Sequence, residues 1–457
     1  MTPPNADGAV VTHERKSRRR AALAVVAIGA ITAASLVFIS DPVLSRATVI
    51  AGMYLVLALT EVVPPFVPTM LLLVATPLLL GPLGPHYRLP AVLSWPADPV
   101  IALFVGGLAL GLAAERHRID AVIAAKIVWL SRGHRRGLLA FVLLGTATMS
   151  MWMSNVAAAA MVLASLRPVL RREAPQEPFR RAVLLSIAVG ANLGGMATPI
   201  GTGPNALAIA AASERHHITF IGWMAFGVPL VMGMLVVAFV LLVLRYRVRG
   251  SFERAPPVSG AKSGKAFFVV LVFALAVAAW ISEPLHGVSA ALVALVTATV
   301  LFGSGILGKK DLGALDWSTL GLIAGGISLG KLIEHTGLLA RFAQQVDWSA
   351  YPRLAWLGGL VLVSVLLASL MSNTATAALL IPLGMMLDPS PGTAVVIAIA
   401  ASFGMPFTIS TPPNAMVYGE GGLTTGDLLW IGLPLMMIGL GLVTLTGLPV
   451  LRLLGVP

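Results

Sequence analysis

Two Ser-Asn pairs interrupt long apolar stretches of the sequence, at Ser154-Asn155 and at Ser372-Asn373. An asparagine in hydrocarbon is costly unless its amide is hydrogen-bonded. A re-entrant helical hairpin explains the pattern, because its tip leaves backbone N–H and C=O groups free beside these side chains. The half-helix after each Asn would direct the positive end of its dipole at the tip, which suits an anion. The Ser hydroxyls and the free carbonyls suit a small hard cation such as Na⁺.

A second pair of motifs carries proline beside threonine and asparagine, Thr202-Gly203-Pro204-Asn205 and Thr411-Pro412-Pro413-Asn414. Proline lacks a backbone N–H and breaks the helical ladder, and Gly201 and Gly203 permit close backbone approach. We expect both segments to unwind in the middle of the membrane and to expose backbone groups and Thr hydroxyls. One Ser-Asn pair alone could simply join packed helices, and one proline could be a kink. The recurrence of both motifs favours a binding site.

The composition shows what kind of protein carries these motifs. Of the 457 residues 57% are hydrophobic and 11% are charged, and the mean hydropathy is +0.91. These values exclude an ordinary soluble protein and a disordered chain. Because a spanning helix needs about 20 apolar residues, the sequence predicts a polytopic helical membrane protein. The net charge of +12 fits basic cytoplasmic loops better than nucleic-acid binding, and the lack of cysteine removes disulfides and thiolate sites.

Apolar segments and basic residues predict the order of the elements. The expected parts are a basic cytoplasmic N-terminus at 1–20, a first transmembrane helix at 21–46, repeat 1 at 47–244, a cytoplasmic linker at 245–265 and repeat 2 at 266–457. Re-entrant hairpins are expected at about 138–166 and 354–387. Arg residues flank the first hairpin on both sides, so its ends should be cytoplasmic. After Arg353 no Lys or Arg appears until Arg452, so the ends of the second hairpin should face outside.

The two halves repeat the same pattern in the same order. Ser154-Asn155 recurs 218 residues later, and Thr202-Gly203-Pro204-Asn205 recurs 209 residues later. The glycines and acid of Gly106-Gly107-x-x-x-Gly111-x-x-x-Glu115 recur 219 residues later, and Glu61 has a counterpart 222 residues later in Glu283. Opposite loop charges indicate that the repeats are inverted across the membrane. Inverted repeats with broken helices at the midplane are typical of secondary transporters.

At these motifs the sequence resembles the divalent anion/sodium symporter family, which contains dicarboxylate, citrate and sulfate transporters. The resemblance rests on Ser-Met-Trp-Met-Ser-Asn-Val (150–156), Ala-Thr-Pro-Ile-Gly-Thr-Gly-Pro-Asn (197–205), Ser-Asn-Thr-Ala-Thr (372–376) and Ser-Thr-Pro-Pro-Asn (410–414). It implies two inverted-topology repeats, about eleven transmembrane helices with two re-entrant hairpins, a homodimer, and a transport domain that moves against a scaffold domain.

The resemblance also implies which residues form the site. Substrate would be held by Asn155, Val156, Thr202, Asn373, Thr374 and Thr411, and we assign the adjoining Pro204 and Pro412 to it as well. Na⁺ would be held by Ser150, Ser154, Asn155 and Gly201 in repeat 1 and by Ser372, Asn373 and Ser410 in repeat 2, and we assign Asn205 and Asn414 to these ions. The sequence departs from the family pattern where Val156 replaces Thr, Gly203 replaces Pro, and Ala368-Ser369 replaces a Thr-Glu pair.

The sequence thus predicts a secondary active transporter of a small divalent anion, dicarboxylate-like or sulfate-like, driven by Na⁺ through elevator-type alternating access. Because of the departure at Ala368-Ser369, a Na⁺-independent anion exchanger is the alternative within this fold. A metalloid or cation antiporter and a non-transport membrane receptor are the alternatives from other classes. No Walker A motif, no His-x-x-x-His and no convincing carboxylate cluster is present, so we expect neither an enzyme nor an organic cofactor.

We expect a multi-pass protein of the plasma (inner) membrane, with its N-terminus in the cytoplasm, its C-terminus outside and no nucleic-acid partner. Its partners would be the lipid bilayer, the small anion and a second copy of the chain. His216 and His217 stand beside Glu214 and indicate a solvated loop rather than a metal site.

Overall fold

The computed structural model describes residues 6–60, 62–119, 126, 129–213, 216–252, 264–338, 341 and 351–456. Over these ranges the chain consists of α-helices and short 3₁₀ turns, without a strand. Seven helical segments are long and apolar enough to cross a membrane: Arg20–Phe38, Pro42–Thr60, Pro99–Arg116, Phe220–Tyr246, Gly264–Ile281, Arg353–Leu370 and Thr425–Leu453. The prediction of an all-α polytopic membrane protein is confirmed.

The first helix begins earlier than the sequence suggested. Helix α1 spans Ala6–Phe38, so it includes most of the segment predicted as the basic N-terminus. It ends well before position 46, because α2 begins at Pro42, where proline is favourable in a first helical turn. Glu61, the expected counterpart of Glu283, lies outside the described residues.

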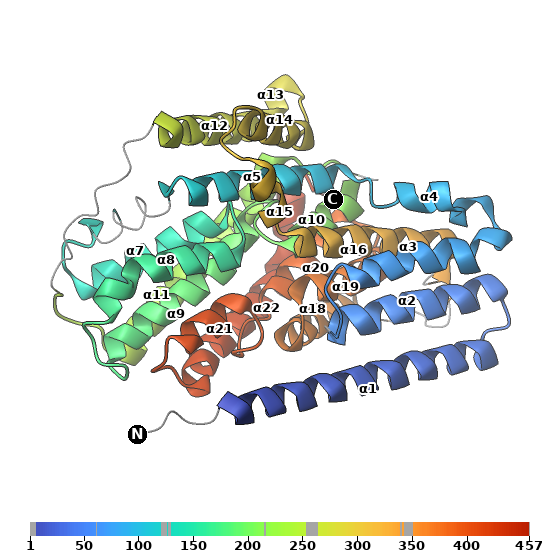
Figure 1. Ribbon diagram of the computed structural model, residues 1–457, viewed down its shortest axis with the longest axis horizontal. Coiled ribbons are helices and arrows are strands. Elements are labelled where there is room, and N and C mark those ends of the chain that lie inside the picture. Colours follow the sequence, from blue (N-terminus) through green and yellow to red (C-terminus); the bar gives the residue numbers. More distant parts are fainter. Residues whose placement is uncertain are drawn as a thin grey trace. The chain divides into compact units, whose positions relative to one another are not determined.

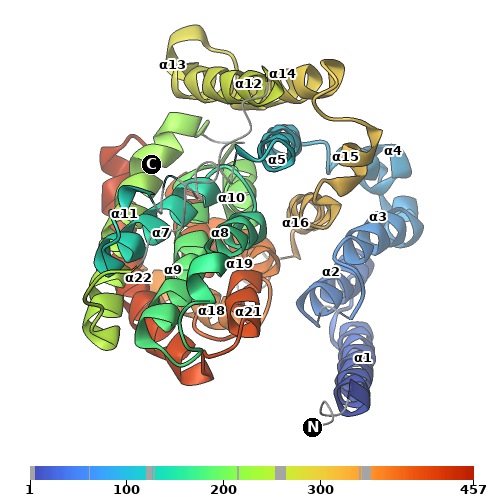
Figure 2. The same ribbon diagram turned by 60° about the vertical axis from the view of Figure 1, so that its left-hand side comes forward.

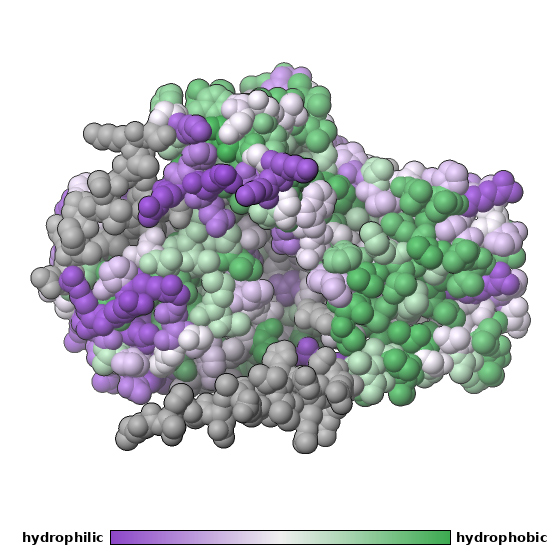
Figure 3. Space-filling model, in the orientation of Figure 1, coloured by the Kyte–Doolittle hydropathy of each residue, from purple (hydrophilic) through white to green (hydrophobic). Residues whose placement is uncertain are grey.

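The chain folds into two compact units. Unit 1 combines Met1–Ala97 with Trp317–Ala350, and its helices are α1, α2 (Pro42–Thr60), α3 (Val67–Leu79), α4 (Leu89–Ser94) and α16 (Trp317–Thr336). Helix α16 packs closely on α3, since the Thr69 hydroxyl donates to the carbonyl oxygen of Gly321 at 2.7 Å. Exposed apolar side chains along α3 include Met70 and Leu78. Figure 3 shows a largely apolar (green) surface over the part of the molecule where Figure 1 draws α2, α3 and α16. Such a surface is typical of helices that face lipid.

Unit 2 combines Asp98–Asp316 with Tyr351–Pro457 and contains both hairpins and both breaks. Its helices from the first half are α5 (Pro99–Arg116), α7 (Arg135–Ser150), α8 (Asn155–Leu170), α9 (Pro178–Gly194), α10 (Gly203–Ser213), α11 (Phe220–Tyr246), α12 (Gly264–Ile281), α13 (Glu283–His286), α14 (Ala290–Gly303) and α15 (Lys309–Ala314). Those from the second half are α18 (Arg353–Leu370), α19 (Asn373–Leu387), α20 (Pro391–Ser402), α21 (Pro412–Gly419) and α22 (Thr425–Leu453). The compact units therefore cut across the two sequence repeats, and the repeat division itself stays a prediction.

The packing inside unit 2 pairs each repeat with the other. Helix α10 of the first repeat packs on α19 and α20, and α21 of the second repeat packs on α8 and α9. In Figures 1 and 2 the green helices of repeat 1 accordingly interleave with the red and orange helices of repeat 2. The centre is formed by α9 and α20, and α20 is buried along its whole length. Helices that are apolar all round, as α20 is, belong in such a core.

Candidate functional site

The first predicted tip is a real break between two helices. Helix α7 ends at Ser150 and α8 begins at Asn155, with Ser154 as N-cap accepting from the Ala157 N–H at 3.2 Å. Ser150 Oγ lies 2.7 Å from Asn155 Oδ1 and 2.7 Å from the carbonyl oxygen of Ala191 on α9. One hydroxyl proton serves only one of these two acceptors, so this tip gathers more oxygen atoms than it has protons for.

The first predicted break lies directly against this tip. After a 3₁₀ turn at Gly195–Ala197 the chain leaves helical geometry and resumes it in α10 at Gly203. Asn205 Nδ2 donates to the carbonyl oxygens of Gly195 at 2.9 Å and Thr198 at 2.8 Å, groups that the interrupted helix leaves free. The Thr198 hydroxyl donates in turn to the carbonyl oxygen of Met151 in the tip. The asparagine thus holds the unwound segment open.

Glycine is required where the first tip meets the first break. A Cβ atom on Gly195 would lie 2.6 Å from Asn155 Oδ1, and one on Gly201 would lie 2.3 Å from the Gly195 carbonyl oxygen. Any larger residue would displace the tip or the neighbouring backbone. The structure therefore brings together Ser150, Asn155, Gly201 and Asn205, whose assignment to Na⁺ stays a prediction.

The second repeat builds the same arrangement. Helix α18 ends at Leu370, and Ser372 is the N-cap of α19, which begins at Asn373. Asn414 Nδ2 donates to the carbonyl oxygens of Met405 and Phe407, both at 2.9 Å, and so mirrors Asn205. The Ser410 hydroxyl donates to the Ser369 carbonyl oxygen at 2.6 Å, which joins the second break to the end of α18.

Contacts between the repeats bring the two halves together. A Cβ atom on Gly203 would lie 2.3 Å from the Thr374 hydroxyl oxygen, so the first break directly faces the second tip. Asn192 Nδ2 on α9 donates to Asn414 Oδ1 in the second break at 3.1 Å. Elements that the sequence placed about 200 residues apart therefore meet within unit 2. Among the other assigned residues, Thr202 is half-buried and Pro204 is buried, whereas Val156 and Pro412 are exposed.

Buried oxygen atoms without hydrogen-bond partners gather at these motifs. In the described part of the chain five of the seven such side-chain oxygens lie in them, and a sixth belongs to Asn192, whose amide contacts the second break: Asn205 Oδ1, Asn373 Oδ1, Thr376 Oγ1, Thr408 Oγ1, Thr411 Oγ1 and Asn192 Oδ1. A buried acceptor left unpaired is unfavourable and calls for an explanation. One explanation is that these oxygens are ligands for a cation or a water molecule.

The electrostatics of the site come from backbone rather than from charged side chains. The tips and breaks consist of neutral residues, and four helices begin at them: α8, α10, α19 and α21. Each helix N-terminus carries about half a positive charge. The arrangement can therefore hold an anion at the helix ends and a cation among the unpaired oxygens.

Sequence reasoning missed part of the site. Thr376 and Thr408 lie inside the quoted motifs but were not assigned a role, and Asn192 was not noticed at all. A buried amide in the mainly apolar part of helix α9 after Arg181 was the available signal. The hydrogen bond from Asn192 to Asn414 makes the two break asparagines differ. Both the amide nitrogen and the amide oxygen of Asn414 are hydrogen-bonded, whereas Asn205 Oδ1 has no partner.

The chain is similar to known transporters. A family model described as citrate transporter matches residues 55–396. An uncharacterized transporter of Haemophilus influenzae is 29% identical over 75% of this chain and 79% of its own length. The inorganic phosphate transporter PHO87 of Saccharomyces cerevisiae is 28% identical over 73% of this chain, but the match covers only 38% of that protein. The sodium-dependent dicarboxylate transporter SdcS of Staphylococcus aureus is 25% identical over 78% of this chain and 77% of its own length.

The fold also occurs in a solved structure. The YdaH transporter of Alcanivorax borkumensis superposes with a TM-score of 0.55 at 16% sequence identity, covering 85% of this chain and 98% of that one. At this identity the likeness concerns the fold alone. It agrees with the helical architecture described above.

Proposed function

The chain belongs to the citrate transporter family, as its resemblance to the divalent anion/sodium symporters led us to expect, and we propose that it carries a small divalent anion across the membrane in company with Na⁺. The family and its relatives are described as transporters. This agrees with the expectation of a transporter rather than an enzyme or a receptor. The observation that carries the proposal is the neutral site, where four helix N-termini and six unpaired buried oxygens lie together.

The proposed mechanism follows from charge. The anion lies at the N-termini of α8 and α19, with hydroxyls such as those of Thr374 and Thr411 as donors. Na⁺ is held by side-chain and carbonyl oxygens, at Asn155 and Asn205 in repeat 1 and at Asn373 and Ser410 in repeat 2. A cation a few ångströms from the anion raises its affinity by direct attraction, and linkage requires that the anion raises Na⁺ affinity equally. This reciprocity couples the two fluxes.

Alternating access requires the loaded site to face each side in turn. Because unit 2 contains both tips and both breaks, we propose that it moves as one body in an elevator-type cycle within a homodimer. The base of the first hairpin is fastened to the segment after α11, since the Arg135 N–H donates to the Gly250 carbonyl oxygen at 3.1 Å and Arg136 Nε to that of Val248 at 2.8 Å. Both segments are rich in arginine, which supports a cytoplasmic location for this end of the hairpin. The N-terminus would then lie inside and the C-terminus outside.

The substrate class is narrowed by the relatives. SdcS is named for dicarboxylate and PHO87 for inorganic phosphate. Both substrates, like sulfate, present several oxygens with about two negative charges. We therefore place dicarboxylates first and tetrahedral oxyanions second. Exchange without Na⁺ is the alternative, favoured by Ala368-Ser369 in the place of the Thr-Glu pair.

Uptake by proteoliposomes tests the function directly. With an imposed inward Na⁺ gradient we expect accumulation of labelled succinate, citrate, sulfate, thiosulfate or phosphate, and no accumulation when K⁺ replaces Na⁺. Empty liposomes are the control. Flux that ignores Na⁺ but accelerates with anion inside the vesicle would replace symport by exchange, and absence of flux for every anion would refute the proposal.

Na⁺ should also stabilise the purified protein. A ligand that binds only the folded state at 100 times its dissociation constant adds about 2.7 kcal/mol, so the thermal unfolding midpoint should rise by several degrees when NaCl replaces choline chloride. Ionic strength is equal in both samples, which removes screening as a cause. Replacing Asn373 by the nearly isosteric leucine should reduce the increase, because one unpaired oxygen assigned to Na⁺ disappears. An equal midpoint in both salts contradicts coupling to Na⁺.

A further inference from the structure

The first turns of α11 support both parts of the first half-site. The Phe220 ring stacks on Trp152 of the first tip, with ring centroids 6.0 Å apart. Trp223 Nε1 donates to the carbonyl oxygen of Met196 at 3.0 Å, just before the first break. A Cβ atom on Gly227 would lie 2.8 Å from that same oxygen, so α11 is in direct contact with the 3₁₀ turn. A displacement of this end of α11 would therefore move the tip and the break together.

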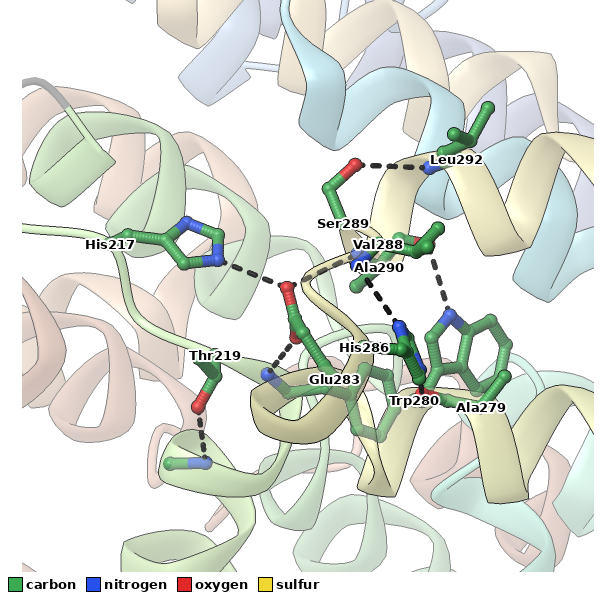
Figure 4. Close-up of polar contacts among 12 residues, drawn as sticks. His217, Thr219, Ala279, Trp280, Glu283, His286, Val288, Ser289, Ala290 and Leu292 are labelled. Atoms are coloured by element: carbon green, nitrogen blue, oxygen red, sulfur yellow. Dashed lines mark hydrogen bonds and ion pairs between the residues drawn. The ribbon is translucent and has the colours of Figure 1, made fainter.

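A buried carboxylate fixes this end of α11. Figure 4 shows the Glu283 side chain, which is 5% exposed, between three donors. Its Oε2 accepts from the Phe220 N–H at 3.1 Å, and its Oε1 accepts from the Ala290 N–H at 3.3 Å and lies 3.0 Å from His217 Nε2. Phe220 and Ala290 are the first residues of α11 and α14, so the charge lies at the positive ends of two helices. His217, expected in a solvated loop, is exposed but also binds this acid, whereas Glu214 lies outside the described residues.

Aromatic rings extend the anchor to the tip. Trp280 stacks on Phe220 at 4.8 Å and donates from Nε1 to the Ala290 carbonyl oxygen at 3.0 Å. Trp152 packs on this pair, with its centroid 6.2 Å from that of Trp280. Trp152 is two residues from Ser154, the N-cap of α8. A continuous set of contacts thus joins Glu283 to the ligand-binding tip.

The second repeat anchors its corresponding helix in a similar way. Helix α22 follows the second break, and a Cβ atom on its Gly432 would lie 3.1 Å from the Met405 carbonyl oxygen. Its first turn carries the buried Asp427, whose Oδ1 accepts from the Tyr246 hydroxyl at 2.6 Å and whose Oδ2 lies 3.5 Å from Arg181. In both repeats a buried acid therefore fixes the helix that supports the break. The acid belongs to α22 itself in repeat 2, but α13 supplies it in repeat 1.

We propose that Glu283 is a positioning residue of the first half-site: it fixes the start of α11 and the Phe220–Trp280 pair, and through them it holds Trp152 and the first tip in place. A buried carboxylate is retained only where donors compensate its desolvation, and removal of the charge loosens what the donors held. The proposal rests on the proposed function in one respect, namely that this tip binds the ligand.

The chain contains no cysteine, so a single introduced thiol reports on its own site. Met153 in the first tip is 8% exposed and packs on Gly111, and Met405 in the second break is 2% exposed. N-ethylmaleimide labelling of Met153→Cys in detergent should become about 10-fold faster when Glu283→Gln is added, because labelling of a buried thiol tracks the population of the open form. Labelling of Met405→Cys should stay unchanged by the same substitution.

Equal acceleration at both thiols would indicate general destabilisation and would overturn the proposal, as would unchanged labelling of Met153→Cys. If Glu283→Gln does not fold, His217→Ala removes one donor and leaves both backbone donors, and it should accelerate Met153→Cys alone by a smaller factor. Labelling needs no ligand. Failure of anion uptake by the unaltered protein would therefore refute the proposed function without touching this result.

Discussion

Replacing Asn373 by alanine is expected to abolish transport without weakening the ligand-free protein. Asn373 Oδ1 is buried and has no hydrogen-bond partner, so its removal relieves a desolvation penalty of about 1–3 kcal/mol rather than breaking a bond. Loss of a ligand oxygen worth about 3 kcal/mol reduces affinity about 100-fold. Uptake into proteoliposomes should disappear, and the unfolding midpoint in choline chloride should be equal to or above that of the unaltered protein.

The corresponding substitution in the first tip separates ligand binding from structural stabilisation. Asn155→Ala should also abolish uptake, but it removes the contact of Oδ1 with the Ser150 hydroxyl and so should lower the unfolding midpoint. Thr148→Ala is a matched control, because this exposed hydroxyl bonds only within α7. It should leave uptake and stability unaltered. Normal uptake by Asn373→Ala or Asn155→Ala would remove that tip from the site.

The positions of the tips and breaks could be read from the sequence because their causes are local. A Ser-Asn pair in an apolar stretch can cap a helix, and its side chains require hydrogen-bond partners. In the structure α8 and α19 begin at these asparagines. Proline and glycine likewise force the breaks. The expected bounds 354–387 agree closely with those of α18 and α19, whereas the bounds 138–166 fall short at both ends. Helix α7 begins earlier, with Arg135 and Arg136, and α8 continues past Arg167 to Leu170.

Contacts between the repeats could not be predicted, because no local pattern encodes them. The bond from Asn192 to Asn414 and the approach of Thr374 to Gly203 depend on how α9, α10, α19 and α21 cross. The sequence offset paired Glu283 with Glu61, yet the described partners of Glu283 are on α11, α14 and the loop before α11. A repeat offset identifies equivalent positions, but it does not identify the neighbours that tertiary packing brings to them.

The Gly201→Ala substitution is expected to have the second large effect on transport. In Gly201→Ala the added Cβ would lie 2.3 Å from the Gly195 carbonyl oxygen, a backbone atom that cannot rotate away. That oxygen accepts from Asn205, so a shift of Gly195 also strains the amide that holds the break open. Overpacking of this kind costs about 1–3 kcal/mol, and the displaced ligands should reduce uptake about 100-fold. Both the uptake rate and the unfolding midpoint should fall.

The control for this change is Gly233→Ala on α11. A Cβ atom at Gly233 meets nothing within 4 Å, and alanine is favoured over glycine inside a helix by about 1 kcal/mol. We expect full uptake and an equal or higher unfolding midpoint in that variant. If Gly201→Ala transports as well as Gly233→Ala, the first break tolerates a methyl group where the backbone packs most closely, and the site cannot depend on the geometry described for Gly195, Gly201 and Asn205. A loss confined to Gly201→Ala instead ties transport to the unwound segment itself, since the methyl group added there meets backbone atoms and the one added at Gly233 meets nothing within 4 Å.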